Sequence, residues 1–315
     1  MNILIFGSGV IGTTYAWQLH EAGHQVSMLV RKLRMVRYSH SGVPITYTDM
    51  RSGKKSYGQT VFRPKIVDKL EPSQAFDLII VTVRSHQLGD VVPYIAKFGG
   101  NAHILFLGNL WDEIKLIRKH LPGGRYFFAY PGIVTGGHLD NGINTYLFRN
   151  DYTWIGEPGG RKTDRLLATL TKFEEAGLRP RPCSKIEDLL RTRYMMDALL
   201  PGLLSKAGSS RLFAKNNTLI KQYIMALKEG VRVCKKLGVN VTKQFPLNRL
   251  YFPTFILSHM IRRSMTYEVQ AAMEAHMKHG PTEKKKQYLD ILNTGKRLKV
   301  SIPYWASFEK YMDFS

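Results

Sequence analysis

The sequence predicts a mixed α/β fold in which an N-terminal doubly wound parallel sheet is followed by an all-α C-terminal domain. Three observations predict it: an apolar opening run that ends at regularly spaced glycines, strand and helix patterns that alternate through the first half, and purely helical patterns beyond about residue 184. The composition agrees, because 315 residues with 44% hydrophobic side chains can build a core in each of two domains. We expect these domains at residues 1–180 and 181–315.

The first elements are the clearest. Residues 2–6 are almost wholly apolar, which is typical of a strand buried on both faces. Residues 10–22 favour a helix that stops at Gly23, and residues 25–30 predict a second strand, which completes a β-α-β unit. The same signals predict strands at 78–83, 103–107 and 125–129, a helix at 88–98, and a hairpin-like edge made of 144–148 and 152–155. Together they indicate a Rossmann-like domain.

The second half favours helices. Two prolines in the basic stretch 178–182 are typical of a linker, and Ser184 and Glu187 have the spacing of a capping box. The capping box opens a long helix toward Leu200, which we expect Pro201 to kink or end. A buried stripe of Leu219, Tyr223, Leu227, Val231 and Cys234 predicts a helix at 217–237. Further helices are predicted at 253–279, at 282–297 and after Pro303.

The charge and the cysteines limit the partners and the compartment. A net charge of +22 predicts attraction to anions, without distinguishing nucleic acids, lipids and phosphorylated small molecules. The apolar runs are too short to span a bilayer, residues 1–19 lack the basic start of a signal peptide, and two cysteines cannot form a disulfide framework. We therefore expect a cytoplasmic protein with no membrane partner.

Two other features favour structural roles. The ten histidines include His138, His276 and His279, but none has the spacing of a zinc site, so we expect no metal. The lysine run 284–286 is typical of a solvated helix face, and the stacking aromatic residues of a nucleic-acid patch are sparse around it. No nucleic-acid partner is expected.

The opening strand is followed by the motif G-x-G-x-x-G, which comprises Gly7, Ser8, Gly9, Val10, Ile11 and Gly12. The first glycine permits a tight turn, the second lets the backbone approach a pyrophosphate, and the third lets the helix pack closely on the sheet. The helix N-terminus then faces the anion. Because the motif leaves a strand and opens a helix, it predicts dinucleotide binding; a purely structural glycine turn is the alternative.

The residue after the second strand indicates which dinucleotide is bound. Enzymes that prefer NAD place an acidic residue there to accept the ribose 2′-hydroxyl, whereas this chain has Arg31 followed by Lys32. A guanidinium suits a 2′-phosphate through paired, charge-assisted hydrogen bonds. We therefore expect NADP, the alternative being that Arg31 is a solvated surface charge.

With this loop in place, further segments make the chain resemble the ketopantoate reductase (2-dehydropantoate 2-reductase) family. The stretch Val81-Thr82-Val83-Arg84 is similar to the family's strand that ends in a lysine near the nicotinamide, with Gln87 in the short helix that follows. Phe106-Leu107-Gly108-Asn109 is similar to the strand that ends in a characteristic asparagine. Thr282-Glu283 and Val300-Ser301-Ile302-Pro303 resemble two C-terminal segments, the first of which holds the family's glutamate.

The resemblance implies NADPH-dependent reduction of a 2-oxo acid, with the anionic substrate in the cleft between the domains. It gives Asn109, Arg193, Asp197 and Glu283 as candidate catalytic residues, and Arg84 and Asn109 as further contacts of the cofactor. The helices of the second domain also suggest a homodimer by analogy with related dehydrogenases. Asn109 could instead be a turn former, and Glu283 a carboxylate that favours a helix N-terminus.

Several of these positions depart from the family. Arg193 stands where the family has its catalytic lysine, Asp197 where it has an asparagine, and Pro201 at about the next asparagine position. Arg84 also replaces a lysine, and Ala271 stands in the place of a serine. An arginine stabilises an alkoxide but is a poor proton donor at pH 7. Arg193 and Asp197 could equally form an ordinary helix ion pair.

These departures leave two hypotheses of different classes. The chain is either a reductase of 2-dehydropantoate or a related ketoacid, or a non-catalytic NADP(H)-binding protein that acts as a redox-responsive interaction module. Loss of the lysine, asparagine and serine motivates the second hypothesis.

Overall fold

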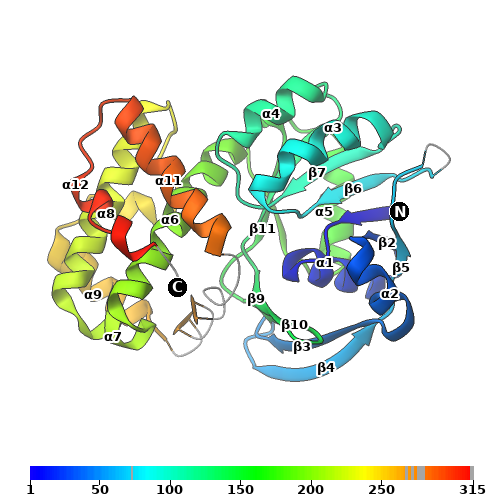
Figure 1. The fold of residues 1–315 in the computed structure, drawn as a ribbon, viewed down its shortest axis with the longest axis horizontal. Coiled ribbons are helices and arrows are strands. Elements are labelled where there is room, and N and C mark those ends of the chain that lie inside the picture. Colours follow the sequence, from blue (N-terminus) through cyan, green and yellow to red (C-terminus); the bar gives the residue numbers. More distant parts are fainter. Residues whose placement is uncertain (72–73, 267–268, 271–272, 275–280, 313–315) are drawn as a thin grey trace. The chain divides into compact units, whose positions relative to one another are not determined.

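The structure is a computed structural model that describes residues 1–315 apart from 72–73, 267–268, 271–272, 275–280 and 313–315. The chain divides into two compact units, Met1–Glu187 and Asp188–Ser315. Unit 1 is mixed α/β, and unit 2 is helical over its described residues (Figure 1). The predicted fold class is therefore confirmed.

The core of unit 1 is an eight-stranded sheet with the order β12-β11-β8-β7-β6-β1-β2-β5. Its strands are β1 Asn2–Phe6, β2 Gln25–Leu29, β5 Lys65–Val67, β6 Leu78–Val81, β7 His103–Leu107, β8 Tyr126–Pro131, β11 Thr153–Gly156 and β12 Pro180–Pro182. All neighbouring strands are parallel except β11 and β8, which pair antiparallel. The order of the strands reverses at β1, so the crevice beside β1 and β6 is a topological switch point.

Both faces of this sheet are covered, which explains why its central strands β1, β6 and β7 are apolar almost throughout. The helices of unit 1 are α1 Val10–Glu21, α2 Lys32–Ser41, α3 Leu88–Phe98, α4 Glu113–His120 and α5 Asp164–Glu175. Ile3 and Ile5 share a buried cluster with side chains of α1 and α5. Phe6 points to the opposite face, where its ring lies 6.0 Å from the ring of Tyr94 on α3. Alternate residues of β1 therefore supply two cores.

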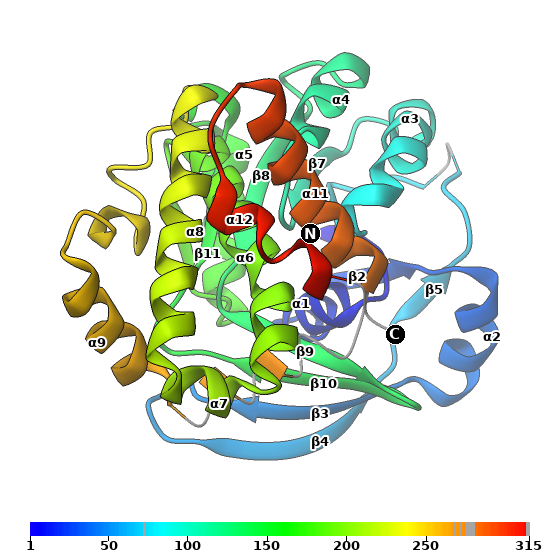
Figure 2. The same ribbon diagram turned by 60° about the vertical axis from the view of Figure 1, so that its left-hand side comes forward.

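Unit 1 contains a second, four-stranded sheet that the sequence did not predict as such. Its order is β4-β3-β10-β9, with β3 at Val43–Asp49, β4 at Ser56–Phe62, β9 at Val134–Leu139 and β10 at Gly142–Leu147. Helix α1 lies between this sheet and the large one (Figures 1 and 2). The hydroxyls of Thr14 on α1 and Thr145 on β10 are 2.9 Å apart. The helix that follows the glycine loop is therefore held on two sides.

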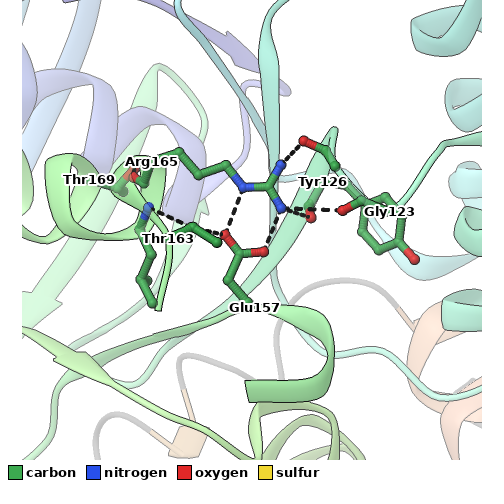
Figure 3. Close-up of polar contacts among 8 residues, drawn as sticks. Gly123, Tyr126, Glu157, Thr163, Arg165 and Thr169 are labelled. Carbon is green, nitrogen blue, oxygen red and sulfur yellow. Dashed lines mark hydrogen bonds and ion pairs between the residues drawn. The ribbon is translucent and has the colours of Figure 1, made fainter. Parts of the chain in front are cut away.

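A buried ion pair fixes the start of α5 to the start of β8. Arg165 binds both carboxylate oxygens of Glu157, and its guanidinium also donates to the carbonyl oxygens of Gly123, Gly124 and Tyr126 (Figure 3). The hydroxyl of Thr163 donates to the same carboxylate at 2.6 Å. Both charged side chains are almost fully buried. Each therefore depends on the other for its solvation.

Unit 2 is built on two long helices, α6 Ile186–Ala207, which begins two residues before the unit, and α8 Asn217–Lys236. The other helices are α7 Ser210–Lys215, α9 Thr254–Ser264, α11 Pro281–Arg297 and α12 Pro303–Ala306. The predicted stripe on α8 is confirmed for Leu219, Leu227, Val231 and Cys234, which are buried, while Tyr223 is half-buried. Burial raises the pKa of the Cys234 thiol to about 12.

Two local predictions were wrong, and a third, that Pro201 kinks or ends its helix, was wrong as to the end. Residues 144–148 and 152–155 do not form a hairpin, because β10 joins the small sheet while β11 pairs with β8. The stretch 178–182 is not a linker, because Pro180–Pro182 forms the edge strand β12, where prolines are tolerated. Helix α6 does not end at Pro201 but continues to Ala207.

The helix predicted at 253–279 is not continuous. Helix α9 ends at Ser264 and residues 265–266 are not helical, while 269–270 and 273–274 are helical again and the rest of the stretch lies outside the described residues.

Candidate functional site

The glycine loop lies at the carboxyl end of β1, at the switch point of the large sheet. Gly7 has a φ of +124°, which an L side chain rarely adopts, so the chain can turn sharply out of the strand. Gly9 is the N-cap residue of α1, and the first turn of α1 holds no acidic residue. The loop therefore presents backbone N–H groups and the positive end of a helix dipole.

The three glycines of the loop differ in the space around them. A Cβ on Gly12 would lie 2.4 Å from the carbonyl oxygen of Gly7 and from Oγ1 of Thr82, and one on Gly7 would lie 2.8 Å from that same hydroxyl. A Cβ on Gly9 would meet nothing within 4 Å. Gly7 and Gly12 are thus required by packing, whereas the backbone at Gly9 is open to approach by a ligand.

Two arginines follow β2. Arg31 is the exposed N-cap residue of α2, at the position expected from the sequence. Arg34, one turn into α2, reaches back to the glycine loop, where its Nη1 lies 2.8 Å from the carbonyl oxygen of Ser8 and 3.2 Å from its hydroxyl. We had not predicted this second arginine, although its position three residues beyond Arg31 in a basic helix start is a signal for it.

The ends of β6 and β7 add polar side chains at the same edge of the sheet. Thr82 directly follows β6, and its hydroxyl lies 3.3 Å from the carbonyl oxygen of Gly7. Arg84 is half-buried and precedes a short 3-10 turn, where its backbone N–H donates to the side chain of Gln87 at 3.2 Å. Asn109 follows β7 and is also half-buried. Since β1, β6 and β7 are parallel, their carboxyl ends lie at one edge of the sheet, and these residues all follow that edge.

These residues fit a nicotinamide dinucleotide. The open backbone at Gly9 and the start of α1 suit a pyrophosphate, while two guanidinium groups after β2 suit an additional phosphate. In an open α/β sheet, ligands bind outside the carboxyl ends of the strands at such a switch point.

The other candidate residues lie in unit 2. Arg193 and Asp197 are both half-buried and stand one turn apart on α6. The hydroxyl of Tyr223 on α8 has a raised pKa, mainly because the side chain is buried and also because the carboxylate of Asp197 is near. Asp197 therefore lies close enough to α8 for its charge to act on Tyr223.

Glu283 is half-buried in the first turn of α11 and is followed by three lysines. Those lysines are not simply a solvated face, as we had expected, because Lys284 is buried and Lys286 Nζ lies 2.6 Å from a carboxylate oxygen of Asp290. That carboxylate also accepts a hydrogen bond from the buried hydroxyl of Tyr194 on α6. The helix of Glu283 and the helix of Arg193 are thus joined by a polar contact.

Some candidates cannot be placed. Ala271, His276 and His279 lie outside the described residues. Among the residues that the structure describes, no group of three His, Cys, Asp or Glu side chains could hold a metal ion. Within the same residues, no helix is both long and apolar enough to cross a bilayer.

Comparisons with known proteins agree with this geometry. The family model for ketopantoate reductase PanE/ApbA matches residues 3–160. The uncharacterized oxidoreductase YkpB of Bacillus subtilis is 22% identical over 313 residues, which cover 96% of this chain and 95% of that protein. The 2-dehydropantoate 2-reductase of Aquifex aeolicus is 24% identical over 213 residues, which cover 64% of this chain and 59% of that enzyme.

The fold is also similar to that of a solved enzyme. D-mandelate dehydrogenase in a ternary structure with NADH and anilino(oxo)acetate has a TM-score of 0.79 and 18% identity, with 99% of this chain and 97% of that one covered. The match of the family model to half of the chain, over the segment that holds the glycine loop, Arg84 and Asn109, decides the assignment. The chain belongs to the ketopantoate reductase PanE/ApbA family and, with it, to the oxidoreductases that reduce ketoacids with a nicotinamide cofactor.

Proposed function

We propose that this chain binds NADPH through unit 1 and reduces a 2-oxo acid, 2-dehydropantoate or a related ketoacid, to the 2-hydroxy acid. The observation that carries the proposal is the glycine loop at the switch point, open at Gly9 and flanked by two arginines. The family assignment supports the reaction class, and the D-mandelate dehydrogenase of similar fold was solved with NADH and an oxo acid derivative.

The preference for NADPH rests on Arg31 and Arg34. A 2′-phosphate is recognised by charge-assisted hydrogen bonds, and a guanidinium can supply two of them in parallel. Arg31 is exposed at the end of the strand, and Arg34 is held toward the loop by its contact with Ser8. The 2′-hydroxyl of NADH carries no charge for the guanidinium groups of Arg31 and Arg34 to bind. The reduced nicotinamide, when bound, supplies the hydride.

The substrate groups are assigned by charge. Hydride addition to the carbonyl carbon breaks the C=O π bond and leaves a negative charge on the oxygen, which then takes a proton. We propose that Asn109 donates a hydrogen bond to that oxygen. We propose that Arg84 contacts the cofactor and the carboxylate of the 2-oxo acid beside it. We assign Arg193 to stabilising the alkoxide, with Asp197 and Glu283 orienting the substrate. Because a guanidinium does not release its proton at pH 7, the proton comes from water or another acid.

Titration of the purified chain with NADPH and with NADH tests the cofactor. Arg31→Ala and Arg34→Ala are each expected to weaken NADPH binding about ten- to a hundredfold, the value of a hydrogen bond to a charged group, and to leave NADH nearly unchanged. Arg37→Ala is the matched control, because Arg37 lies on the same helix but binds the turn at Asp140 and Asn141. Equal affinity for both cofactors, unaltered by either variant, would refute the NADPH assignment.

A panel of 2-oxo acids, followed by loss of NADPH absorbance, tests the reaction. We expect turnover of at least one member, and the double variant Arg193→Lys with Asp197→Asn is expected to raise turnover of 2-dehydropantoate, since a lysine can donate a proton. General acid catalysis contributes about 10²–10⁴-fold in rate. Binding of NADPH without turnover of any oxo acid, by the natural chain or by the double variant, would favour the non-catalytic binding protein instead.

A further inference from the structure

One segment of unit 2 exposes large apolar side chains to solvent. It runs from the end of α8 through a 3-10 turn at Leu247–Arg249 to the end of α9. The exposed fraction is 72% for Phe255, 59% for Tyr251 and 56% for Phe245, and Phe252 and Ile256 are also exposed. We call this segment, residues 235–263, the aromatic patch.

The patch is a constructed surface rather than a loose loop. Leu247 and Leu257 are buried and anchor its two parts, and Ser258 is buried beside Leu257, where its hydroxyl donates to the carbonyl oxygen of Thr254. The backbone N–H of Phe252 donates to the carbonyl oxygen of Arg249, so the turn is closed by a hydrogen bond. The exposed rings thus project from an anchored backbone, and the core does not require them.

The charge around these rings has one sign. Residues 230–266 contain seven lysines and arginines and no aspartate or glutamate. They include Lys235 and Lys236 at the end of α8, Lys243 before the turn, and the exposed pair Arg262 and Arg263 at the end of α9. A surface with exposed apolar rings and only positive charge is complementary to an anionic, partly apolar partner.

The cations also limit which partner fits. The guanidinium of Arg249 lies 4.8 Å from the ring centroid of Phe245, and the ammonium of Lys235 lies 5.1 Å from that of Tyr251. One face of each of these two rings is therefore taken by a cation, which disfavours base stacking of a single-stranded nucleic acid there. A second copy of the patch, carrying the same positive charge, would be repelled.

We propose that the aromatic patch docks this protein peripherally on an anionic lipid membrane. Phe252, Phe255 and Ile256 enter the boundary between headgroups and acyl chains, while Arg262 and Arg263 contact the lipid phosphates. Aromatic rings prefer this boundary, and each cation near an anionic surface adds to the binding. The proposal is independent of the reductase activity and goes beyond the sequence-based expectation of no membrane partner, which rested on the lack of a membrane-spanning run and of a signal peptide.

Vesicle flotation tests the proposal. The full chain is mixed with phosphatidylcholine vesicles, or with vesicles in which part of the phosphatidylcholine is replaced by phosphatidylglycerol. Strong binding is expected only to the second kind, and it should fall as salt is added. Arg262→Gln with Arg263→Gln should weaken it about thirtyfold, and Phe255→Ser with Ile256→Ser at least tenfold.

Matched controls lie in unit 1. Arg161→Gln with Lys162→Gln removes two exposed adjacent cations, and Leu167→Ser removes an apolar side chain that is 52% exposed. Neither control should change flotation, and all variants should keep their circular dichroism and their affinity for NADPH. Equal binding to neutral vesicles, or unchanged binding of both patch variants, would overturn the proposal. Two further results would overturn it if no vesicle binding were seen. One is a dimer that dissociates in the patch variants, and the other is binding of single-stranded RNA through the patch.

Discussion

The two units differ in what fixes their candidate residues. In unit 1 the groups of the glycine loop that suit a pyrophosphate belong to the backbone, and contacts of Gly7, Gly12 and Thr82 hold the loop in one shape. In unit 2 the candidates Arg193 and Glu283 are side chains on two helices, which are joined through Tyr194 and Asp290. A site made of backbone tolerates few substitutions, whereas a site made of side chains can exchange one group for another on the same helix.

This difference explains where the chain departs from its family. The glycine loop keeps every expected glycine, because a Cβ at Gly7 or Gly12 has no room. If the resemblance drawn from the sequence holds on α6, an arginine there takes the place of a lysine and an aspartate that of an asparagine, and the helix forms from Ile186 to Ala207. We therefore expect cofactor binding to depend on the fold itself, and the substrate chemistry to depend on side chains that can be exchanged.

The buried charges of the two units give the largest expected contrast. Arg165→Met in unit 1 leaves the buried carboxylate of Glu157 without its cation, so we expect a loss of about 3–5 kcal/mol in the free energy of unfolding. Arg232→Met in unit 2 removes a half-exposed cation 3.6 Å from Glu229, whose other oxygen keeps the backbone N–H of Trp305 at 2.7 Å. We expect about 1 kcal/mol or less there.

Urea unfolding followed by circular dichroism measures both values. The double variant Glu157→Gln with Arg165→Met is the control, because it removes both charges and should recover part of the loss. Similar losses for Arg165→Met and Arg232→Met would show that burial of the cation does not decide the cost.

The fold could be predicted from the sequence wherever neighbours in space are neighbours along the chain. The β-α-β unit at residues 2–29 and the stripe on α8 are local patterns, and both were found. The small sheet was not found, because β10 pairs in parallel with β3 across about a hundred residues, and no local pattern encodes that pairing. Pro201 does not end its helix, although a proline inside a helix removes one backbone hydrogen bond, so this residue alone did not predict the end of α6.

The candidate site shows the same limit. The glycine motif and Arg31 could be proposed from the sequence, because their positions relative to a strand are typical of a dinucleotide-binding site. Arg34 was missed, since only the folded loop shows that its side chain reaches Ser8. The roles of Arg193, Asp197 and Glu283 stay predictions, because their chemistry depends on a substrate that no motif specifies.

A smaller difference is expected between two glycines of the loop in unit 1, Gly9 and Gly12, when each is replaced by alanine. Gly12→Ala places a methyl group 2.4 Å from two oxygen atoms, so we expect it to cost about 1–3 kcal/mol of stability and most of the NADPH affinity. Gly9→Ala places its methyl group in open space, so stability should change by about 0.5 kcal/mol or less. NADPH binding should nevertheless weaken at least tenfold, because the methyl group occupies the approach of the pyrophosphate. Thermal unfolding with and without NADPH separates these effects, and full NADPH affinity in Gly9→Ala would argue against a pyrophosphate at that point.

The smallest expected effect is a pH dependence of opposite sign in the two units. In unit 1, burial lowers the pKa of His24 below its ordinary 6.5, so the unfolded chain takes up the proton first and stability is lost as the pH falls below 6.5. In unit 2, burial raises the pKa of Glu229 above its ordinary 4.5, so the stability from its protonated form is present below 4.5 and is lost as the pH rises through the folded value.

Native-state hydrogen exchange of α1 and of α8, corrected for the intrinsic rate at each pH, measures the stability of the two units separately. His24→Gln should flatten the response of α1 only and Glu229→Gln that of α8 only, while the exposed control Glu174→Gln should alter neither. If both units responded to both substitutions, they would unfold as one cooperative body, and the contrast between them would hold for their chemistry but not for their stability.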